Sequence, residues 1–281
     1  MQNSQNRKSN NTLNKSDNNF LELPKKNILG VDVTNASKEN ILEFIFKSLK
    51  KSTKPYYIVT PNPEMIVLSR KNTAFKNVLN HAKLALNDGV GVGVAGKIMG
   101  KTLNDRFTGV DLVEKVCEKG NDWPITVGFL GGRPKVAEKA AECLASRFPS
   151  LRIVFIGQEW EKDKIVKGEE YLVSSISYSA KDKIQNKDLI DILFVAFGAP
   201  KQELWMAEHV EKIPAKIMAG VGGAFDQIVN PNLRPPHFVQ YLGLGWLYRL
   251  MRQPWRIRRQ FALGEFVWLV VREKLFSTAS S

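Results

Sequence analysis

The chain has 281 residues, of which 43% are hydrophobic and 25% charged, and its formal net charge at pH 7 is +13. Its length allows one large core or two modest ones, and its composition is that of an ordinary globular protein. The excess of lysine and arginine indicates an anionic partner, whether nucleic acid, acidic lipid or a phosphorylated substrate. The two cysteines, Cys117 and Cys143, exclude a disulfide framework and lack metal-ligand spacing, so we expect core thiols.

The first 20 residues are rich in Asn, Ser, Gln and Lys, and we expect residues 1–20 to be disordered. They lack the apolar stretch of a secretory signal. The longest uncharged apolar run near the C-terminus, residues 266–271, is far shorter than the ~20 residues that span a bilayer. We therefore expect a protein that lies on a membrane without crossing it.

Short apolar runs alternate with helical patterns between residues 21 and 230, which we assign to one α/β domain. The predicted strands are residues 28–33, 56–60, 84–86, 125–130, 152–156, 192–196 and 216–221. The predicted helices include residues 38–50, 63–68, 109–119, 134–148 and 201–212. This alternation predicts a mainly parallel, Rossmann-like sheet covered by helices on both faces.

Five of the predicted strands are followed by loops that combine a turn-permitting Gly or Pro with a polar side chain. Ligands of parallel sheets bind beyond the carboxyl ends of the strands. We therefore expect the five loops to line one cleft; they are residues 60–64, 88–91, 131–134, 198–203 and 222–226.

Asp88, between a predicted strand and a glycine, is a candidate general base that removes a proton from an attacking hydroxyl. The alternative is an Asx-turn or a helix N-cap, because Asp-Gly is a strong turn dipeptide. Thr60 and Asn62 either bond sugar hydroxyls or cap the next helix, with Pro63 in its first turn.

Two further loops offer groups for a phosphate or a sugar. The backbone amides of Gly131 and Gly132 can approach a phosphate beside a helix N-terminus, or the two glycines form a plain tight turn. Lys201 can meet a diphosphate and Gln202 can orient a sugar or nucleobase, or both belong to a solvated first helical turn.

The segment Gly-Val-Gly-Val-Ala-Gly at residues 91–96 matches the dinucleotide-binding fingerprint literally. That fingerprint must end a strand and open a helix, with an acidic residue at the end of the next strand. The nearest candidate, Asp111, lies within a predicted helix. A nicotinamide-dependent dehydrogenase is therefore weakly supported.

Residues 231–281 form a basic, helical appendage in which arginines are interleaved with tryptophan, phenylalanine and leucine. This pattern is typical of a membrane surface with anionic headgroups. Four arginines at intervals of three and four residues are predicted to share one helix face, although Pro254 should kink or restart the helix. They are Arg249, Arg252, Arg256 and Arg259, and their face is suited to lipid headgroups, a diphosphate or RNA, or is merely solvated.

In order along the chain, these motifs resemble the WecG/TagA/CpsF family of bacterial glycosyltransferases, glycosyltransferase family 26. The resemblance covers about residues 27–260. It rests on TPNPE at 60–64, NDGVGV at 87–92, DRFTGVDL at 105–112, FLGGRP at 129–134, FGAPKQE at 197–203, GVGGAFD at 220–226, and RPP, LGWLYRL and QPWRIRR within 234–259.

The resemblance implies inverting transfer of an N-acetylmannosamine-type sugar from a UDP donor to undecaprenyl-diphosphate-linked N-acetylglucosamine, for teichoic acid, common antigen or capsule. It implies no bound metal or other cofactor, and a cytoplasmic protein held peripherally on the inner face of the cell membrane. Asp88 matches the family's proposed base, Thr60 and Asn62 line the site, and Arg106 and Gln202 help to hold the donor. The tail arginines, including Arg249, Arg256 and Arg259, match an appendage thought to complete the site at the membrane.

The chain departs from the family pattern at Gly245, where Glu is usual, and at Pro235, where Ala is frequent. These changes are consistent with a different donor or acceptor. The alternative function is a non-catalytic nucleotide- or RNA-binding protein with a basic tail. No RRM signature occurs, which favours the transferase and no nucleic-acid partner. The sequence leaves open the exact sugars, the pathway and the oligomeric state, a homo-oligomer included.

Overall fold

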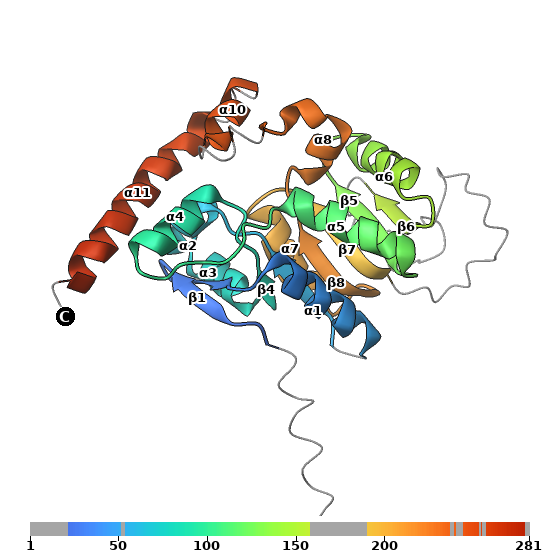
Figure 1. Ribbon diagram of the computed structural model, residues 1–281, viewed down its shortest axis with the longest axis horizontal. Helices are drawn as coiled ribbons and strands as arrows, with labels where there is room; N and C mark the ends of the chain where they lie inside the picture. The colour runs from blue at the N-terminus through green and yellow to red at the C-terminus, as the bar shows by residue number, and fades with distance from the viewer. Residues whose placement is uncertain are drawn as a thin grey trace, which may run out of the picture.

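The computed structural model describes residues 22–51, 54–157, 190–236, 239, 244–252, 254 and 257–278. The segment predicted to be disordered, residues 1–20, lies outside the described residues. The described chain is built around a parallel sheet with helices on both faces, and its last helix runs beside α2 and α4 (Figure 1).

The sheet has six parallel strands in the order β4-β3-β8-β7-β5-β6. This arrangement confirms the predicted α/β fold with a mainly parallel sheet. The strands are β3 (Tyr56–Val59), β4 (Leu84–Ala85), β5 (Thr126–Gly131), β6 (Arg152–Gly157), β7 (Ile190–Ala196) and β8 (Ala215–Gly220). The helices are α1 (Lys38–Lys50), α2 (Pro63–Lys71), α3 (Thr73–His81), α4 (Val90–Ile98), α5 (Gly109–Asp122), α6 (Val136–Arg147), α7 (Lys201–His209), α8 (Ala224–Val229), the short η2 (Pro231–Leu233), α10 (Gly245–Arg252) and α11 (Ile257–Thr278).

The single strand predicted for residues 28–33 is wrong. The segment forms an antiparallel hairpin of β1 (Lys25–Ile28) and β2 (Val31–Thr34), separate from the main sheet. Leu29 and Gly30 form its two-residue turn, with φ of 51° and 91°. Positive φ at both turn residues matches the twist of a hairpin. The apolar run concealed the turn because Leu rarely adopts this conformation.

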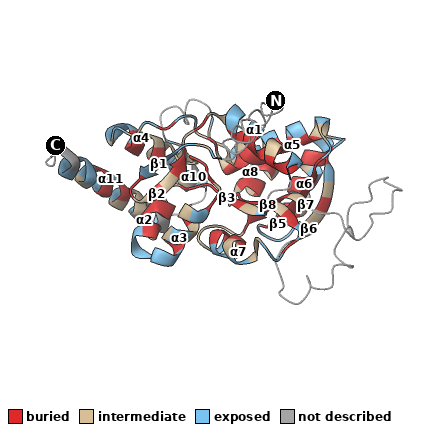
Figure 2. Ribbon diagram, turned by 90° about the horizontal axis from the view of Figure 1, so that it is seen from below, coloured by how far each residue is buried: buried red, intermediate tan, exposed pale blue. Residues whose placement is uncertain are grey.

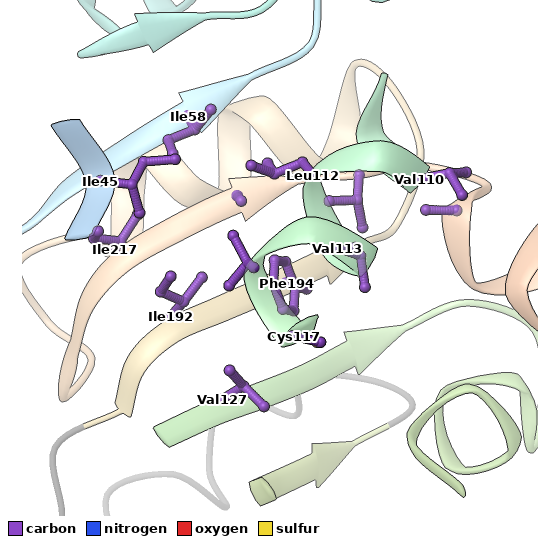
Figure 3. Close-up of a cluster of buried hydrophobic side chains, with 14 of the residues drawn as sticks. Ile45, Ile58, Val110, Leu112, Val113, Cys117, Val127, Ile192, Phe194 and Ile217 are labelled. Atoms are coloured by element: carbon purple, nitrogen blue, oxygen red, sulfur yellow. The ribbon is translucent and has the colours of Figure 1, made fainter. Parts of the chain in front are cut away.

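Alternate residues of the central strands contribute side chains to two hydrophobic cores, one on each face of the sheet. Along β7, Ile192 and Phe194 join the core under α1, α5 and α6, whereas Leu193 and Val195 join the core under α2, α3 and α7. Strand side chains alternate between faces, so the continuous apolar run of β7 is what a doubly covered strand requires. Figure 3 shows the first core, where Cys117 of α5 lies among buried side chains, as predicted for a core thiol. Figure 2 shows how buried residues concentrate along the sheet.

The last helix, α11, packs against the α/β unit. Phe266, Leu269 and Val270 are buried in the second core, and Lys71 of α2 forms an ion pair with Glu265 at 2.6 Å. The predicted interruption at Pro254 is confirmed, because α10 ends at Arg252 and α11 begins at Ile257. Arg249 and Arg252 belong to α10 and Arg259 belongs to α11. The predicted shared face of the four arginines depends on side chains that lie outside the described residues. Among the described helices, none is long and apolar enough to cross a bilayer.

Among the described residues, one carboxyl-bearing side chain is buried, that of Glu203. Glu203 of α7 is fully buried, its Oε1 accepts a hydrogen bond from Gln202 at 2.7 Å, and its Oε2 has no hydrogen-bond partner. Burial raises the pKa of Glu203 to about 7, because the charged form loses its hydration. Glu203 is therefore largely protonated in the folded protein at mildly acidic pH.

Glu203 should make stability depend on pH. Its folded pKa is about 7 against 4.5 when unfolded, so the folded state binds the proton more tightly between these values. The free energy of unfolding should fall by roughly 3 kcal/mol as pH rises from about 4.5 to about 7. Glu203→Gln should remove this component, as measured by urea unfolding across that range. Glu142→Gln, at an exposed position of α6, is the control. If Glu203→Gln showed the same pH dependence of stability as the wild type, the assignment of this dependence to Glu203 would be refuted.

Candidate active site

A cleft with a volume of about 1540 Å³ lies at the carboxyl ends of the parallel strands. All five predicted loops contribute to its lining, which confirms that they share one cleft. From these loops the lining residues are Thr60, Asn62, Pro63, Glu64, Asp88, Gly89, Val90, Gly91, Gly132, Arg133, Gly198, Ala199, Lys201, Gln202, Gly222, Gly223 and Asp226.

Asp88 is half-buried in the loop between β4 and α4, where its backbone is held from two sides. Its N–H donates to Pro61 O at 3.4 Å, and its carbonyl accepts from Arg106 Nε at 3.1 Å. The N-cap of α4 is Gly89, so the helix-cap interpretation of Asp88 is wrong. Arg106 lines the same cleft and thus both supports the Asp88 loop and presents a cation beside it. The role of Asp88 as a base stays a prediction.

The TPNPE loop is fixed by its own polar side chains. Thr60 is buried and its Oγ1 donates to Gly220 O at 3.0 Å, which joins the ends of β3 and β8. Asn62 Oδ1 accepts from Met65 N at 3.0 Å, with Pro63 in the first turn of α2, so the predicted helix cap is confirmed. Both residues also line the cleft, and their contact with a sugar stays a prediction.

Gln202 joins two glycine-containing loops. Its Oε1 accepts from Gly198 N at 3.0 Å and from Gly222 N at 3.1 Å, while its Nε2 donates to Glu203. The side chain is only 2% exposed. These bonds give Gln202 a positioning role in the loops after β7 and β8. Its predicted contact with a sugar or nucleobase is not tested by this geometry.

The two glycines at the end of β5 have the geometry of a tight turn. Gly131 and Gly132 have φ of 94° and 90°, and a Cβ at Gly131 would lie 2.7 Å from the Phe197 ring. The N–H of Gly132 donates to Ala196 O at 3.1 Å. The turn interpretation is confirmed, and the phosphate interpretation stays a prediction. Lys201 is exposed at the start of α7, with its Nζ 5.3 Å from the centroid of the Phe197 ring.

The segment that matches the dinucleotide-binding fingerprint, residues 91–96, does not form the strand–turn–helix structure that this fingerprint requires. Gly91, Gly93 and Gly96 all lie inside α4, not in a turn between a strand and a helix, so the nicotinamide interpretation is wrong. These glycines allow close packing instead. A Cβ at Gly91 would lie 2.8 Å from Pro63, and one at Gly96 would lie 2.7 Å from Lys101 O.

The cleft has an apolar arm that sequence reasoning missed. It is formed by residues of α4 and α11. The lining residues from these helices are Val90, Gly91, Val94, Ala95, Ile98, Leu263, Gly264, Phe266, Val267, Val270 and Val271. The sequence feature that could have indicated this arm is the alternation of valine and glycine in α4. An apolar helix with small side chains leaves space for close packing or for a ligand.

The segment after η2 is tied to α5 by ion pairs and reaches the cleft. Arg234 Nη2 lies 2.6 Å from Glu114 Oε2, and Arg147 Nη1 lies 2.8 Å from Glu114 Oε1. Burial opposes ionisation of Glu114, but the two arginines outweigh it and hold its pKa below the usual value. Arg234 and Trp246 line the cleft.

Gly245, at the family's usual Glu position, also lines the cleft. A Cβ there would lie 3.5 Å from Pro235, an ordinary contact, so the backbone would accept a larger residue. The side chains of Arg249 and Arg259, and all of Arg256, lie outside the described residues. Within the described part of the chain, no group of three His, Cys, Asp or Glu residues is placed to hold a metal ion.

Comparison with known proteins matches residues 26–280 to the Glycosyl transferase WecG/TagA/CpsF family. An N-acetylglucosaminyldiphosphoundecaprenol N-acetyl-beta-D-mannosaminyltransferase from Bacillus spizizenii is 28% identical over 249 residues, which are 89% of this chain and 91% of that protein. A protein of the same name from Staphylococcus aureus is 28% identical over 254 residues, 89% of this chain and 93% of that protein. The chain therefore belongs to the WecG/TagA/CpsF family of glycosyl transferases.

Proposed function

We propose that the protein is an inverting glycosyltransferase that moves an N-acetylmannosamine-type sugar from a UDP donor to undecaprenyl-diphosphate-linked N-acetylglucosamine. One observation carries the proposal: the separated family motifs converge on a single cleft that contains Asp88. The names of the relatives give the transferred sugar and the lipid-linked acceptor. The product feeds a cell-surface polysaccharide such as wall teichoic acid.

In this proposal Asp88 is the general base. It takes the proton of the acceptor hydroxyl as that oxygen attacks the anomeric carbon, and the bond from this carbon to the UDP oxygen breaks. Attack on the face opposite the leaving group inverts the anomeric configuration. The departing UDP gains negative charge, which Arg106 and Lys201, both on the cleft wall, stabilise together with tail arginines.

The acceptor places the protein at a membrane. Exposed apolar side chains of α11 include Phe261, Trp268 and Leu275, and Arg252 of α10 is exposed. Apolar contact combined with basic residues supports binding to an anionic surface. We place the protein peripherally on the inner face of the cell membrane. The motif-lined cleft and the family favour transfer chemistry over the alternative of RNA binding.

The function is tested by incubating the purified protein with UDP-N-acetylmannosamine and synthetic N-acetylglucosaminyl-diphosphate lipids. We expect the disaccharide lipid by mass spectrometry, with one UDP released per product. UDP-N-acetylglucosamine, which differs only at carbon 2, is the matched donor control. Retarded RNA migration in a gel, together with no product from a panel of UDP-sugars, would contradict the proposal.

Asp88→Asn keeps the shape of the side chain but removes its basicity. We expect turnover to fall by roughly 10²–10⁴-fold, the usual contribution of general-base catalysis, while UDP binding is retained. The measurement is steady-state kinetics with calorimetric titration of UDP. Asp122→Asn, at the exposed end of α5, is the control. Near-normal turnover of Asp88→Asn would show that another group takes the proton.

A further inference from the structure

The apolar arm of the cleft exposes large side chains inside a concavity. Val94 and Ile98 of α4 are 49% and 44% exposed, and Val267 and Val271 of α11 are 60% and 48% exposed. All four line the cleft. Large apolar groups that face a cavity without being packed against the protein indicate a ligand with an apolar part.

The arm is held by packed contacts. Phe266 and Val270 anchor one side of α11 in the second core, and the ion pair of Lys71 with Glu265 fixes α11 to α2. Gly91 of α4 lies next to both α2 and α11: a Cβ there would lie 2.8 Å from Pro63, too close to be accommodated without a shift, and 3.8 Å from Phe266, an ordinary contact. Gly91 lies three residues after Asp88, so the arm begins beside the candidate base.

The chemistry of the cleft changes from one end to the other. The residues that α4 and α11 contribute to its wall are all apolar or glycine, whereas the strand-end loops contribute Asp88, Lys201 and other polar groups. The cleft volume, about 1540 Å³, exceeds the roughly 300–1,000 Å³ of a typical small-molecule pocket. It therefore has room for more than the donor, and its lining matches a ligand with a polar head and an apolar tail.

The outer surface of α11 continues the arm. Ile257, Phe261, Trp268, Val271 and Leu275 are exposed and recur every three to seven residues, which places them on one helix face. Val271 belongs both to this face and to the arm. A hydrocarbon chain that leaves the arm at Val271 thus reaches an apolar surface suited to a membrane.

We propose that the arm between α4 and α11 binds the isoprenoid units next to the diphosphate of the acceptor. This inference rests on the proposed function, since the lipid-linked acceptor comes from it. The arm holds the chain in extended form, so that the acceptor sugar lies in the polar end of the cleft and the remaining isoprenoid stays in the membrane. Chain recognition then contributes to acceptor affinity before any contact with the sugar.

The first test compares two soluble acceptors that differ only in their lipid: N-acetylglucosaminyl-diphosphate with a farnesyl chain or with a methyl group. For the wild type we expect kcat/KM to be roughly 10²–10³-fold higher with farnesyl, as full burial of one isoprene unit implies. The double variant Val94→Ser/Val267→Ser should lower this ratio about tenfold. The control variant Leu204→Ser, at an exposed apolar position of α7 outside the cleft, should leave the ratio unchanged.

An unchanged ratio in the arm variant would overturn the inference while leaving the proposed function intact. Absence of transfer to either acceptor by the wild type would instead count against the proposed function. A second test does not need transfer: ultraviolet crosslinking of a diazirine-bearing farnesyl diphosphate, followed by peptide mass spectrometry. We expect labels within residues 90–98 and 263–271, suppressed by unlabelled farnesyl diphosphate.

Labels confined to the outer face of α11, or none that farnesyl diphosphate suppresses, would overturn the inference. A second copy of the chain seated in the arm is the competing occupant. In that case light scattering would show a dimer. The double variant Val94→Ser/Val267→Ser would dissociate this dimer, whereas farnesyl diphosphate would not. That result would also overturn the inference.

Discussion

The side-chain oxygen of Gln202 is hydrogen-bonded to two of the loops that line the cleft. Gln202 Oε1 accepts N–H groups from the loops after β7 and β8, and Thr60 Oγ1 joins the end of β3 to Gly220. Because β3, β8 and β7 are neighbours, these three bonds fix the floor beneath any ligand. An unbonded buried amide costs about 1–3 kcal/mol, so loss of Gln202 would loosen two loops together. Glu203, which accepts a hydrogen bond from Gln202, belongs to the same unit.

The cleft combines two environments that a transferase acting on a lipid needs. Charged and hydrogen-bonding groups lie at the strand ends, and apolar groups lie between α4 and α11. The same helix, α11, packs into the core with Phe266, faces the cleft with Val267 and exposes Trp268 outward. Successive residues of a helix point about 100° apart, so one segment supplies all three surfaces. This arrangement links the membrane face of the protein to its chemistry.

The sequence predicted the parallel sheet and the shared cleft, because buried parallel strands are continuous apolar runs and their ligands bind beyond the carboxyl ends. It predicted α1 with its observed bounds, Lys38–Lys50, for which Ser37 is the N-cap. It failed where tertiary packing decides. The Leu29-Gly30 turn lies within an apolar run, and the glycines of α4 imitate a nucleotide fingerprint. The apolar arm depends on two helices distant in the sequence, so the valines and glycines of α4 indicate only one of its walls.

The most direct measurement of the central claim is an experimental structure of the protein with UDP and a farnesyl-diphosphate-linked N-acetylglucosamine. The account predicts an acceptor hydroxyl within about 2.6–3.2 Å of the Asp88 carboxylate, on the side of the cleft where the sugar donor would sit. It also predicts the farnesyl chain between Val94 and Val267. An acceptor sugar bound outside the strand-end cleft, away from Asp88, would contradict the account.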